Sequence, residues 1–491
     1  MISPKVVSIH TPDSSSPEAI VASIILPGMT QDEKAMAIWE YCWKNTFHWP
    51  APKEGRRKTH ELDVVFDAGK LLNVYGYSYC FAIRSLGEAL YEAAGLEARS
   101  GGISGHVVAE VYYDGKYHFL DHDQRGFSRL PDGSIASLED YRGRAAELIL
   151  DATRPSRPFF PATLKPMAPY EEKHIFTGYL LNQLKHYRQH DKYRTAHSMS
   201  FPLLPGMRFT RSWDACGKWH CPPGFAGGNR FDGYGDPYDG PRELFTDEYR
   251  EARRLDDGGP LRYANGLLVY RPDLGEGSRD FEAGVFAHEN VDARGGGFGP
   301  AKAGKVARAD FRIRLPYVIA GWPGDIAKPD DVSGAAVLSG RFRRTMKSDR
   351  LRALVSIDNG ATWREVWAAA KTGESGFATD FSPIVEGRYD YMMRFEMKAA
   401  GAPGDLRLLS IGLDTACQLN PATLPAVRSG ENRMTVSFEP GPEVFDETVQ
   451  YFDRAAHDDN IKVIVLAANG PHFSSGHDLR EEDPRGNMAK F

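Results

Sequence analysis

The 491-residue chain is predicted to be an α+β protein, because three stretches of different character follow one another. Residues 73–123 indicate one helix followed by a pair of β-strands, and residues 309–438 indicate short alternating strands separated by turn signals. Residues 442–466 return to a helical run and a continuous apolar strand. A chain of this length is expected to form about three domains.

The helix of the first stretch is expected over Phe81 to Ala94, where helix formers dominate and apolar residues recur at nearly helical spacing. Gly76 supplies a turn before this helix, and Gly95 ends it. Cys80 therefore lies in the first helical turn. The N-terminus of a helix carries partial positive charge, which stabilises a thiolate, so Cys80 is a candidate nucleophile.

A β-hairpin is predicted after this helix. The β-prone runs 106–113 and 116–121 flank Asp114-Gly115, a dipeptide typical of two-residue hairpin loops. With that loop, Tyr113 faces Lys116, which fixes how the two strands pair.

This pairing places an imidazole and two carboxylates on one face of the hairpin. His106 lies opposite Asp123 and Asp121 lies opposite Val108; because side chains alternate between faces, all four point the same way. A cysteine nucleophile needs a base, and the base needs an orienting group, so Cys80 joins this set as a candidate for thiol acyl chemistry. The pairing does not choose between the two aspartates. The alternative is a buried structural cysteine beside an exposed hairpin histidine.

Residues 30–150 resemble the transglutaminase-like superfamily, a papain-like group of Cys-His-Asp proteins. The motifs that carry the resemblance are Gly76 to Cys80, the helix after it with Gly95 to Arg99, His106 at the head of a strand, and Phe119-Leu120-Asp121. The resemblance implies Cys80 as nucleophile, His106 as base and Asp121 as orienting carboxylate, in preference to Asp123. It also implies a peptide or amide substrate and no cofactor.

One part of the motif departs from the family. Tyr77-Ser78-Tyr79 stands before the cysteine where many members have Gly-Gln, and Phe81 replaces a tryptophan. The oxyanion donors are then expected to be the Cys80 amide and an upstream group, with Tyr75 and Tyr77 as candidates. Hydrolysis, acyl transfer and an inactive, binding-only version are all compatible with this motif, and protein crosslinking is not implied.

Composition and charge narrow the kinds of partner, location and metal site that are expected. A net charge of -6 without a basic field argues against a nucleic-acid partner, and no apolar run is long enough for a membrane span. The first residues lack a hydrophobic signal core, so a cytoplasmic protein is expected. Five cysteines make no disulfide framework. Cys216-x-x-x-His220-Cys221 has no second pair at zinc-finger spacing, so no metal centre is predicted.

Composition divides the chain into four segments: residues 1–165, 166–300, 301–438 and 439–491. Five prolines within 154–169 mark the end of a first domain, residues 1–165. Residues 166–300 are expected to be rich in helix and loops, with a helix over Glu171 to Tyr193 and a turn at Asn265-Gly266. Residues 301–438 predict a β-sandwich-like accessory domain.

The β-domain contains one recognisable hairpin. Ser356 to Trp363 resembles the Asp-box of sialidase-like and other carbohydrate-associated β proteins. Asp358 is expected to bind backbone amides in the turn while Trp363 packs beneath it, so the hairpin is a folding device. Carbohydrate contact through this domain is a further possibility, and a non-catalytic binding scaffold is the corresponding alternative function.

Residues 439–491 resemble part of the crotonase, or enoyl-CoA hydratase, superfamily. The resemblance rests on Asp459 to Leu466 and on Phe473 to Leu479. It implies that the loop Ser475-Gly476-His477 supplies one oxyanion-hole amide, by position that of His477. The second amide and the catalytic carboxylates of that family lie far downstream, and few residues follow here. The segment is therefore expected to be an incomplete crotonase-like fragment that does not hydrate enoyl-CoA.

Overall fold

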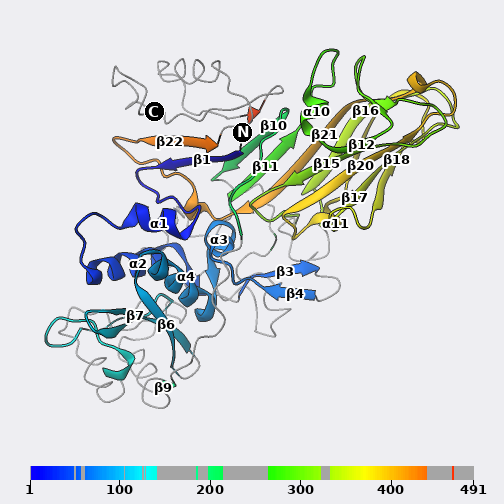
Figure 1. Cartoon of the computed structure of the whole chain (residues 1–491). Coiled ribbons are helices and arrows are strands. Elements are labelled where there is room, and N and C mark those ends of the chain that lie inside the picture. Colours follow the sequence, from blue (N-terminus) through cyan, green and yellow to red (C-terminus); the bar gives the residue numbers. More distant parts are fainter. Residues whose placement is uncertain are drawn as a thin grey trace, which may run out of the picture.

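The computed structural model describes two bodies that lie end to end (Figure 1). The described residues are 2–48, 51–56, 61–103, 106–123, 127, 129–140, 184–185, 197–213, 220, 264–321, 332–439 and 467–468. Helices and strands both contribute, as predicted for an α+β protein. Within these ranges no helix is both long enough and apolar enough to cross a membrane.

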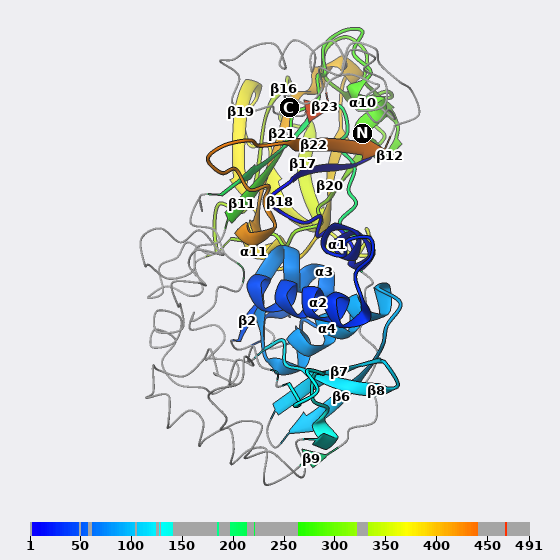
Figure 2. The same cartoon turned by 90° about the vertical axis from the view of Figure 1, so that its left-hand side faces the viewer.

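The first body packs helices against a four-stranded sheet of order β8-β7-β6-β9 (Figure 2). Its helices are α1 (Pro17–Ile24), α2 (Gln31–Asn45), the short α3 (Ala68–Lys70) and α4 (Cys80–Ala93), and its strands are β6 (Glu97–Ile103), β7 (His106–Tyr113), β8 (Lys116–Leu120) and β9 (Leu184–Lys185). One apolar cluster joins Ile38 and Trp39 of α2 with Leu86 of α4 and with Ala109 and Val111 of β7. The helices therefore cover the odd-numbered face of β7.

Helix α2 begins at a capping box. The Thr30 hydroxyl accepts a hydrogen bond from the Glu33 amide at 3.2 Å, and the Glu33 carboxylate accepts one from the Thr30 amide at 2.8 Å. Cys42 of this helix is fully buried, and burial raises the pKa of its thiol far above the ordinary range. Cys42 is thus a core residue of α2.

The predicted hairpin forms with the predicted register, but the ladder ends before the pairs predicted for Asp121 and Asp123. Asp114 and Gly115 adopt φ of 49° and 80°, the left-handed conformation that a two-residue loop between twisted strands requires. Tyr113 faces Lys116, and pairing continues to Ala109 opposite Leu120. Because β8 ends at Leu120, the two candidate aspartates lie just beyond the strand.

The helix predicted over Glu171 to Tyr193 is wrong where the structure describes it. Leu184 and Lys185 form β9, which pairs with Ile103 and Gly102 at the edge of β6. Hydrogen bonding to an open sheet edge outweighs the local helical preference of such a short segment.

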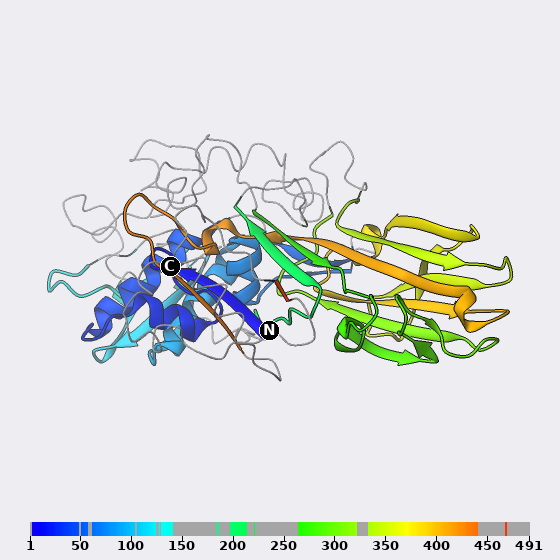
Figure 3. The same ribbon diagram turned by 90° about the horizontal axis from the view of Figure 1, so that it is seen from above.

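The second body consists of two sheets packed face to face, with one apolar cluster between them (Figure 3). The five-stranded sheet contains β12 (Val285–Glu289), β15 (Ala307–Arg314), β20 (Asp390–Lys398), β17 (Arg350–Ser356) and β18 (Arg364–Ala368). The six-stranded sheet contains β19 (Gly373–Asp380), β16 (Ala336–Arg344), β21 (Leu406–Leu419), β11 (Ala264–Tyr270), β10 (Met207–Ser212) and β23 (Ala467–Ala468). The sandwich thus starts at Met207, upstream of the boundary at residue 301 that composition predicts.

Small elements complete the described chain. Two short helices, α10 (Asp280–Gly284) and α11 (Ser382–Val385), lie at the sandwich, with the strand pair β13 (Val291–Asp292) and β14 (Gly299–Pro300). Near the first body lie β2 (Phe47–His48), β3 (Lys53–Arg56), β4 (Glu61–Val64), the π-helical turn η2 (Leu71–Tyr75) and β5 (Tyr77–Ser78). Single 3₁₀ turns, η3 (Pro403–Asp405) and η4 (Pro421–Thr423), precede and follow β21.

The turn predicted at Asn265-Gly266 is wrong, because both residues lie inside β11. A Cβ on Gly266 would come within 2.6 Å of the Cys417 sulfur and 2.8 Å of the Phe209 ring. This glycine therefore serves close packing between strands rather than a change of chain direction.

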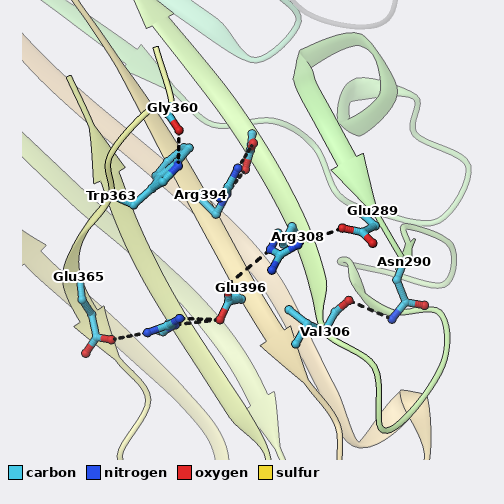
Figure 4. Close-up of polar contacts among 11 residues, drawn as sticks. Glu289, Asn290, Val306, Arg308, Gly360, Trp363, Glu365, Arg394 and Glu396 are labelled. Atoms are coloured by element: carbon cyan, nitrogen blue, oxygen red, sulfur yellow. Dashed lines mark hydrogen bonds and ion pairs between the residues drawn. The ribbon is translucent and has the colours of Figure 1, made fainter. Parts of the chain in front are cut away.

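The Asp-box hairpin folds as expected between β17 and β18. The Asp358 carboxylate accepts hydrogen bonds from the Thr362 amide at 2.8 Å and the Thr362 hydroxyl at 2.5 Å. These bonds lower the pKa of Asp358 to about 2. The Trp363 indole N–H donates to the Gly360 carbonyl at 2.9 Å, and the Arg394 guanidinium lies 3.9 Å from the Trp363 ring (Figure 4).

The exposed face of the five-stranded sheet carries a row of alternating charges (Figure 4). The row crosses all five strands in the order Glu289, Arg308, Glu396, Arg352 and Glu365, with nitrogen–oxygen distances of 3.1, 3.6, 2.7 and 3.3 Å. Cross-strand pairs of opposite charge stabilise a sheet and discourage its edges from pairing with other chains.

The two bodies share a junction built around η2 and β5. Val74, Tyr75 and Tyr77 belong to the apolar cluster of the sandwich. The Gln418 side-chain amide of β21 donates to the Val74 carbonyl at 3.2 Å. The terminal strands β1 (Ile2–Ser8) and β22 (Met434–Glu439) also pair with each other beside this junction (Figure 1).

Candidate functional site

Cys80 is the first residue of α4, as the sequence predicts. The chain reaches it through Gly76, whose φ of 78° closes η2, and through Tyr77-Ser78, which pairs in parallel with β2. Tyr79 has an extended backbone and no side-chain hydrogen bond that caps the helix. Among the described cysteines, Cys42 and Cys417 are buried and Cys80 alone is partly exposed.

His106 is the first residue of β7 and pairs with Ile103 of β6. Helix α4 packs on the odd-numbered face of β7.

Asp121 and Asp123 lie in a tight turn just after β8. Both side chains are buried, with exposed fractions of 1% and 5%. The Asp123 amide donates to Asp121 Oδ1 at 2.9 Å, and the Trp39 indole N–H donates to the Asp121 carbonyl at 2.8 Å. Helix α2 therefore fixes the backbone of the turn that carries both candidate carboxylates.

His122, between these aspartates, is a residue that sequence reasoning missed. Its ring is buried on the helix side, where Nε2 lies 3.0 Å from the Tyr91 hydroxyl of α4. Burial lowers the pKa of His122 to about 3, so the ring is neutral near pH 7. The only signal in the sequence is Gly87, a glycine in the middle of α4 that helix propensity does not explain.

The two oxyanion candidates lie in the junction with the sandwich. Tyr75 and Tyr77 are buried, and the Tyr75 hydroxyl donates to Glu54 Oε1 at 3.0 Å. The Tyr389 hydroxyl also donates to Glu54, and Lys70 pairs with the same carboxylate at 2.5 Å. Any support that Tyr75 or Tyr77 gives to a reacting carbonyl remains a prediction.

An aromatic pair adjoins the thiol. Phe66 is 49% exposed, and its ring centroid lies 4.9 Å from that of Phe81, the residue after Cys80. The ring centroid of Tyr79 lies 6.0 Å from that of Phe81. Aromatic rings therefore gather near the start of α4, where Cys80 lies.

The described residues contain no group of three or more His, Cys, Asp or Glu side chains arranged to hold a metal ion. His220 of the Cys216-x-x-x-His220-Cys221 motif is buried, and its Nδ1 lies 2.6 Å from Glu386 Oε1. Both cysteines of that motif, and the crotonase-like loop Ser475-Gly476-His477, lie outside the described residues.

No protein-family model matches the chain, and no curated protein matches it. Among solved structures, a secreted serine protease, VesC from Vibrio cholerae, is 12% identical over 32% of this chain, with a TM-score of 0.16. The match spans 33% of the protease. A carbohydrate-binding module of the β-sandwich superfamily is 11% identical over 32% of this chain and 74% of the module, with a TM-score of 0.14.

Proposed function

We propose that the first body is a transglutaminase-like thiol enzyme that attacks a peptide or amide carbonyl. Cys80 is the nucleophile, His106 the base, and Asp121 the orienting carboxylate, with Asp123 as its alternative. The observation that carries the proposal is the partly exposed Cys80 thiol at the first residue of α4. A helix N-terminus stabilises the thiolate that such a reaction needs.

The chemistry follows from these roles. His106 accepts the proton of Cys80, and the sulfur attacks the carbonyl carbon to form a tetrahedral intermediate. His106 then gives the proton to the departing amine as the carbon–nitrogen bond breaks, which leaves a thioester on Cys80. Water completes hydrolysis by releasing the carboxylic acid, and an acceptor amine instead completes acyl transfer. The sandwich supports this site through the Tyr75 and Tyr77 junction.

Alkylation of the full chain tests the proposal. Iodoacetamide should label Cys80 faster than an unfolded cysteine peptide near pH 6.5, and His106→Ala should slow the labelling at least about tenfold. Mass mapping separates Cys80 from the buried Cys42. Equal labelling of Cys80 in the parent chain and in His106→Ala would contradict a catalytic pair and favour the binding-scaffold alternative.

An activity assay extends this test to substrate class. Purified chain should hydrolyse a mixed peptide library, or attach a primary amine to it, and Cys80→Ser should abolish both reactions. Asp121→Asn and Asp123→Asn identify the orienting carboxylate, because substitution of the residue that orients His106 should lower the rate at least about 100-fold more than substitution of the other. Loss of activity in neither variant would exclude a Cys-His-Asp mechanism.

A further inference from the structure

The ring of His122 occupies a place in the core that α4 leaves open for it. It is 2% exposed, and its centroid lies 5.4 Å from that of Tyr91 at an interplanar angle of 67°. Nε2 is 3.0 Å from the Tyr91 hydroxyl, which also lies 3.4 Å from the Ala35 carbonyl of α2. Through the Tyr91 hydroxyl, this ring therefore connects the turn after β8 with both helices.

The absence of a side chain at Gly87 leaves room for the His122 ring. A Cβ at Gly87 would lie 2.5 Å from His122 Nε2 and 2.7 Å from Cε1, closer than any non-bonded contact permits. A glycine inside a helix costs about 0.5–1 kcal/mol relative to alanine. Gly87 lies about one helical turn before Tyr91, so α4 gives up some stability at the position where the His122 ring approaches its backbone.

The position of His122 couples this contact to the candidate site. Its chain neighbours are Asp121 and Asp123, the two candidate carboxylates. The same helix begins at Cys80. The ring thus sets how the carboxylate turn sits relative to the helix that carries the thiol, while Trp39 holds the Asp121 carbonyl.

We propose that His122 is a positioning residue of the Cys80–His106–Asp121 site: its ring, held between Gly87 and Tyr91, fixes the carboxylate turn against α4. This inference rests on the proposed function. His122 itself touches no reacting atom; it acts through the orientation of the neighbouring carboxylate, which in turn orients the base.

A second buried histidine on the same hairpin provides a matched control. His118 of β8 is 1% exposed and stacks on Tyr113, with ring centroids 3.7 Å apart. Its ring nitrogens lie 2.7 Å from the Ile135 carbonyl and 3.2 Å from the Tyr113 carbonyl. These polar contacts stay with the sheet and the loop that follows it, so loss of His118 should weaken the fold without moving the carboxylate turn relative to α4.

The test is the pH profile of Cys80 alkylation in the full chain, measured for the parent, His122→Gln, Tyr91→Phe and His118→Gln. Each rate is taken below the melting temperature of that variant, so that only folded protein reports. We expect His122→Gln to slow labelling near pH 6.5 by about tenfold and to move the midpoint of the profile to higher pH, because a misplaced carboxylate no longer supports the charged imidazole. Tyr91→Phe, which keeps the ring volume, should give a smaller shift in the same direction.

The outcomes separate the two proposals. If the pH profile of Cys80 alkylation is the same in the parent and in His106→Ala, both the proposed function and the positioning role are wrong. If His106→Ala changes the profile but His122→Gln does not, the positioning role alone is wrong. Equal shifts in His118→Gln and His122→Gln also overturn it, because they would show a general effect of weakening the hairpin.

Discussion

The two bodies of this chain differ in where their paired polar groups lie. On the sandwich, charges lie on the exposed face of the five-stranded sheet, and each finds an opposite charge on the next strand. In the first body, several polar groups are buried and held by helices, by backbone or by an opposite charge, as with His122 against Tyr91 and Arg84 against Glu88. Opposite charges in an exposed row compensate one another and contribute little to stability, whereas a buried polar group needs a partner at a specific position. The proposed function places the chemistry in the first body, where these buried groups lie.

The largest expected effect follows from the neutral ring of His122. Burial lowers its pKa from the ordinary 6.5 to about 3. Below pH 6.5 the unfolded chain takes up a proton that the folded chain excludes, so the stability that the neutral ring confers is complete above pH 6.5 and is lost as the pH falls toward 3. Its contribution to the free energy of unfolding should fall by about 1.4 kcal/mol per pH unit, or roughly 3 kcal/mol between pH 6.5 and 4.5.

Urea unfolding at several pH values measures this effect. The parent should lose stability with falling pH more steeply than His122→Gln, by the slope given above. His288→Gln, at an exposed position of β12, is the matched control and should keep the parent slope. Parallel slopes for the parent and His122→Gln would show that the pKa of His122 does not differ between the folded and the unfolded chain.

The next largest effect is expected at Gly87. Gly87→Ala forces a methyl group into the His122 ring and should lower the free energy of unfolding by about 1–3 kcal/mol. In a His122→Ala background the same change should stabilise the chain by about 0.5–1 kcal/mol, because the clash is gone and alanine favours the helix. A double-mutant cycle by chemical unfolding measures this reversal of sign. Additive effects of the two changes would show that Gly87 and His122 do not touch.

A smaller effect is expected on the sandwich. Arg394 binds Asp310 through two nitrogens at 2.7 and 2.8 Å, and the Asp310 side chain is 9% exposed. Arg394→Met should cost about 1–2 kcal/mol because it leaves a largely buried carboxylate without this partner. The control is Arg341→Met, whose exposed pair with Glu374 should contribute less than about 0.5 kcal/mol. Equal costs would mean that burial does not distinguish these two ion pairs.

Local signals explain what could be predicted from the sequence. Asp114-Gly115 determines the hairpin and its pairing, and Gly76 and Gly95 bracket the helix that Cys80 begins. These features depend on turn and helix-end conformations that only certain residues adopt. The candidate nucleophile, base and carboxylates could accordingly be named from spacing alone.

Features that depend on distant parts of the chain could not be predicted in this way. Asn265-Gly266 has the composition of a turn, but pairing with β10 and β21 holds it in a strand. Leu184 and Lys185 form a strand because the edge of β6 is open to them. The role of His122 emerges only when α4 lies against the hairpin, since Gly87 is otherwise an unexplained glycine. Tertiary contacts decide each of these cases.

The smallest effect on stability, and the sharpest contrast between the bodies, is expected at Phe66. Its ring is half exposed beside Phe81, so Phe66→Ala should change the free energy of unfolding by less than about 1 kcal/mol. If the aromatic rings near the start of α4 contact the substrate, the same change should raise the KM for peptides with an aromatic residue next to the cleaved bond while kcat changes little. The control is Phe286→Ala, an exposed phenylalanine of the sandwich, which should leave both constants unchanged. Equal KM values for the parent and Phe66→Ala would place substrate on another side of the thiol.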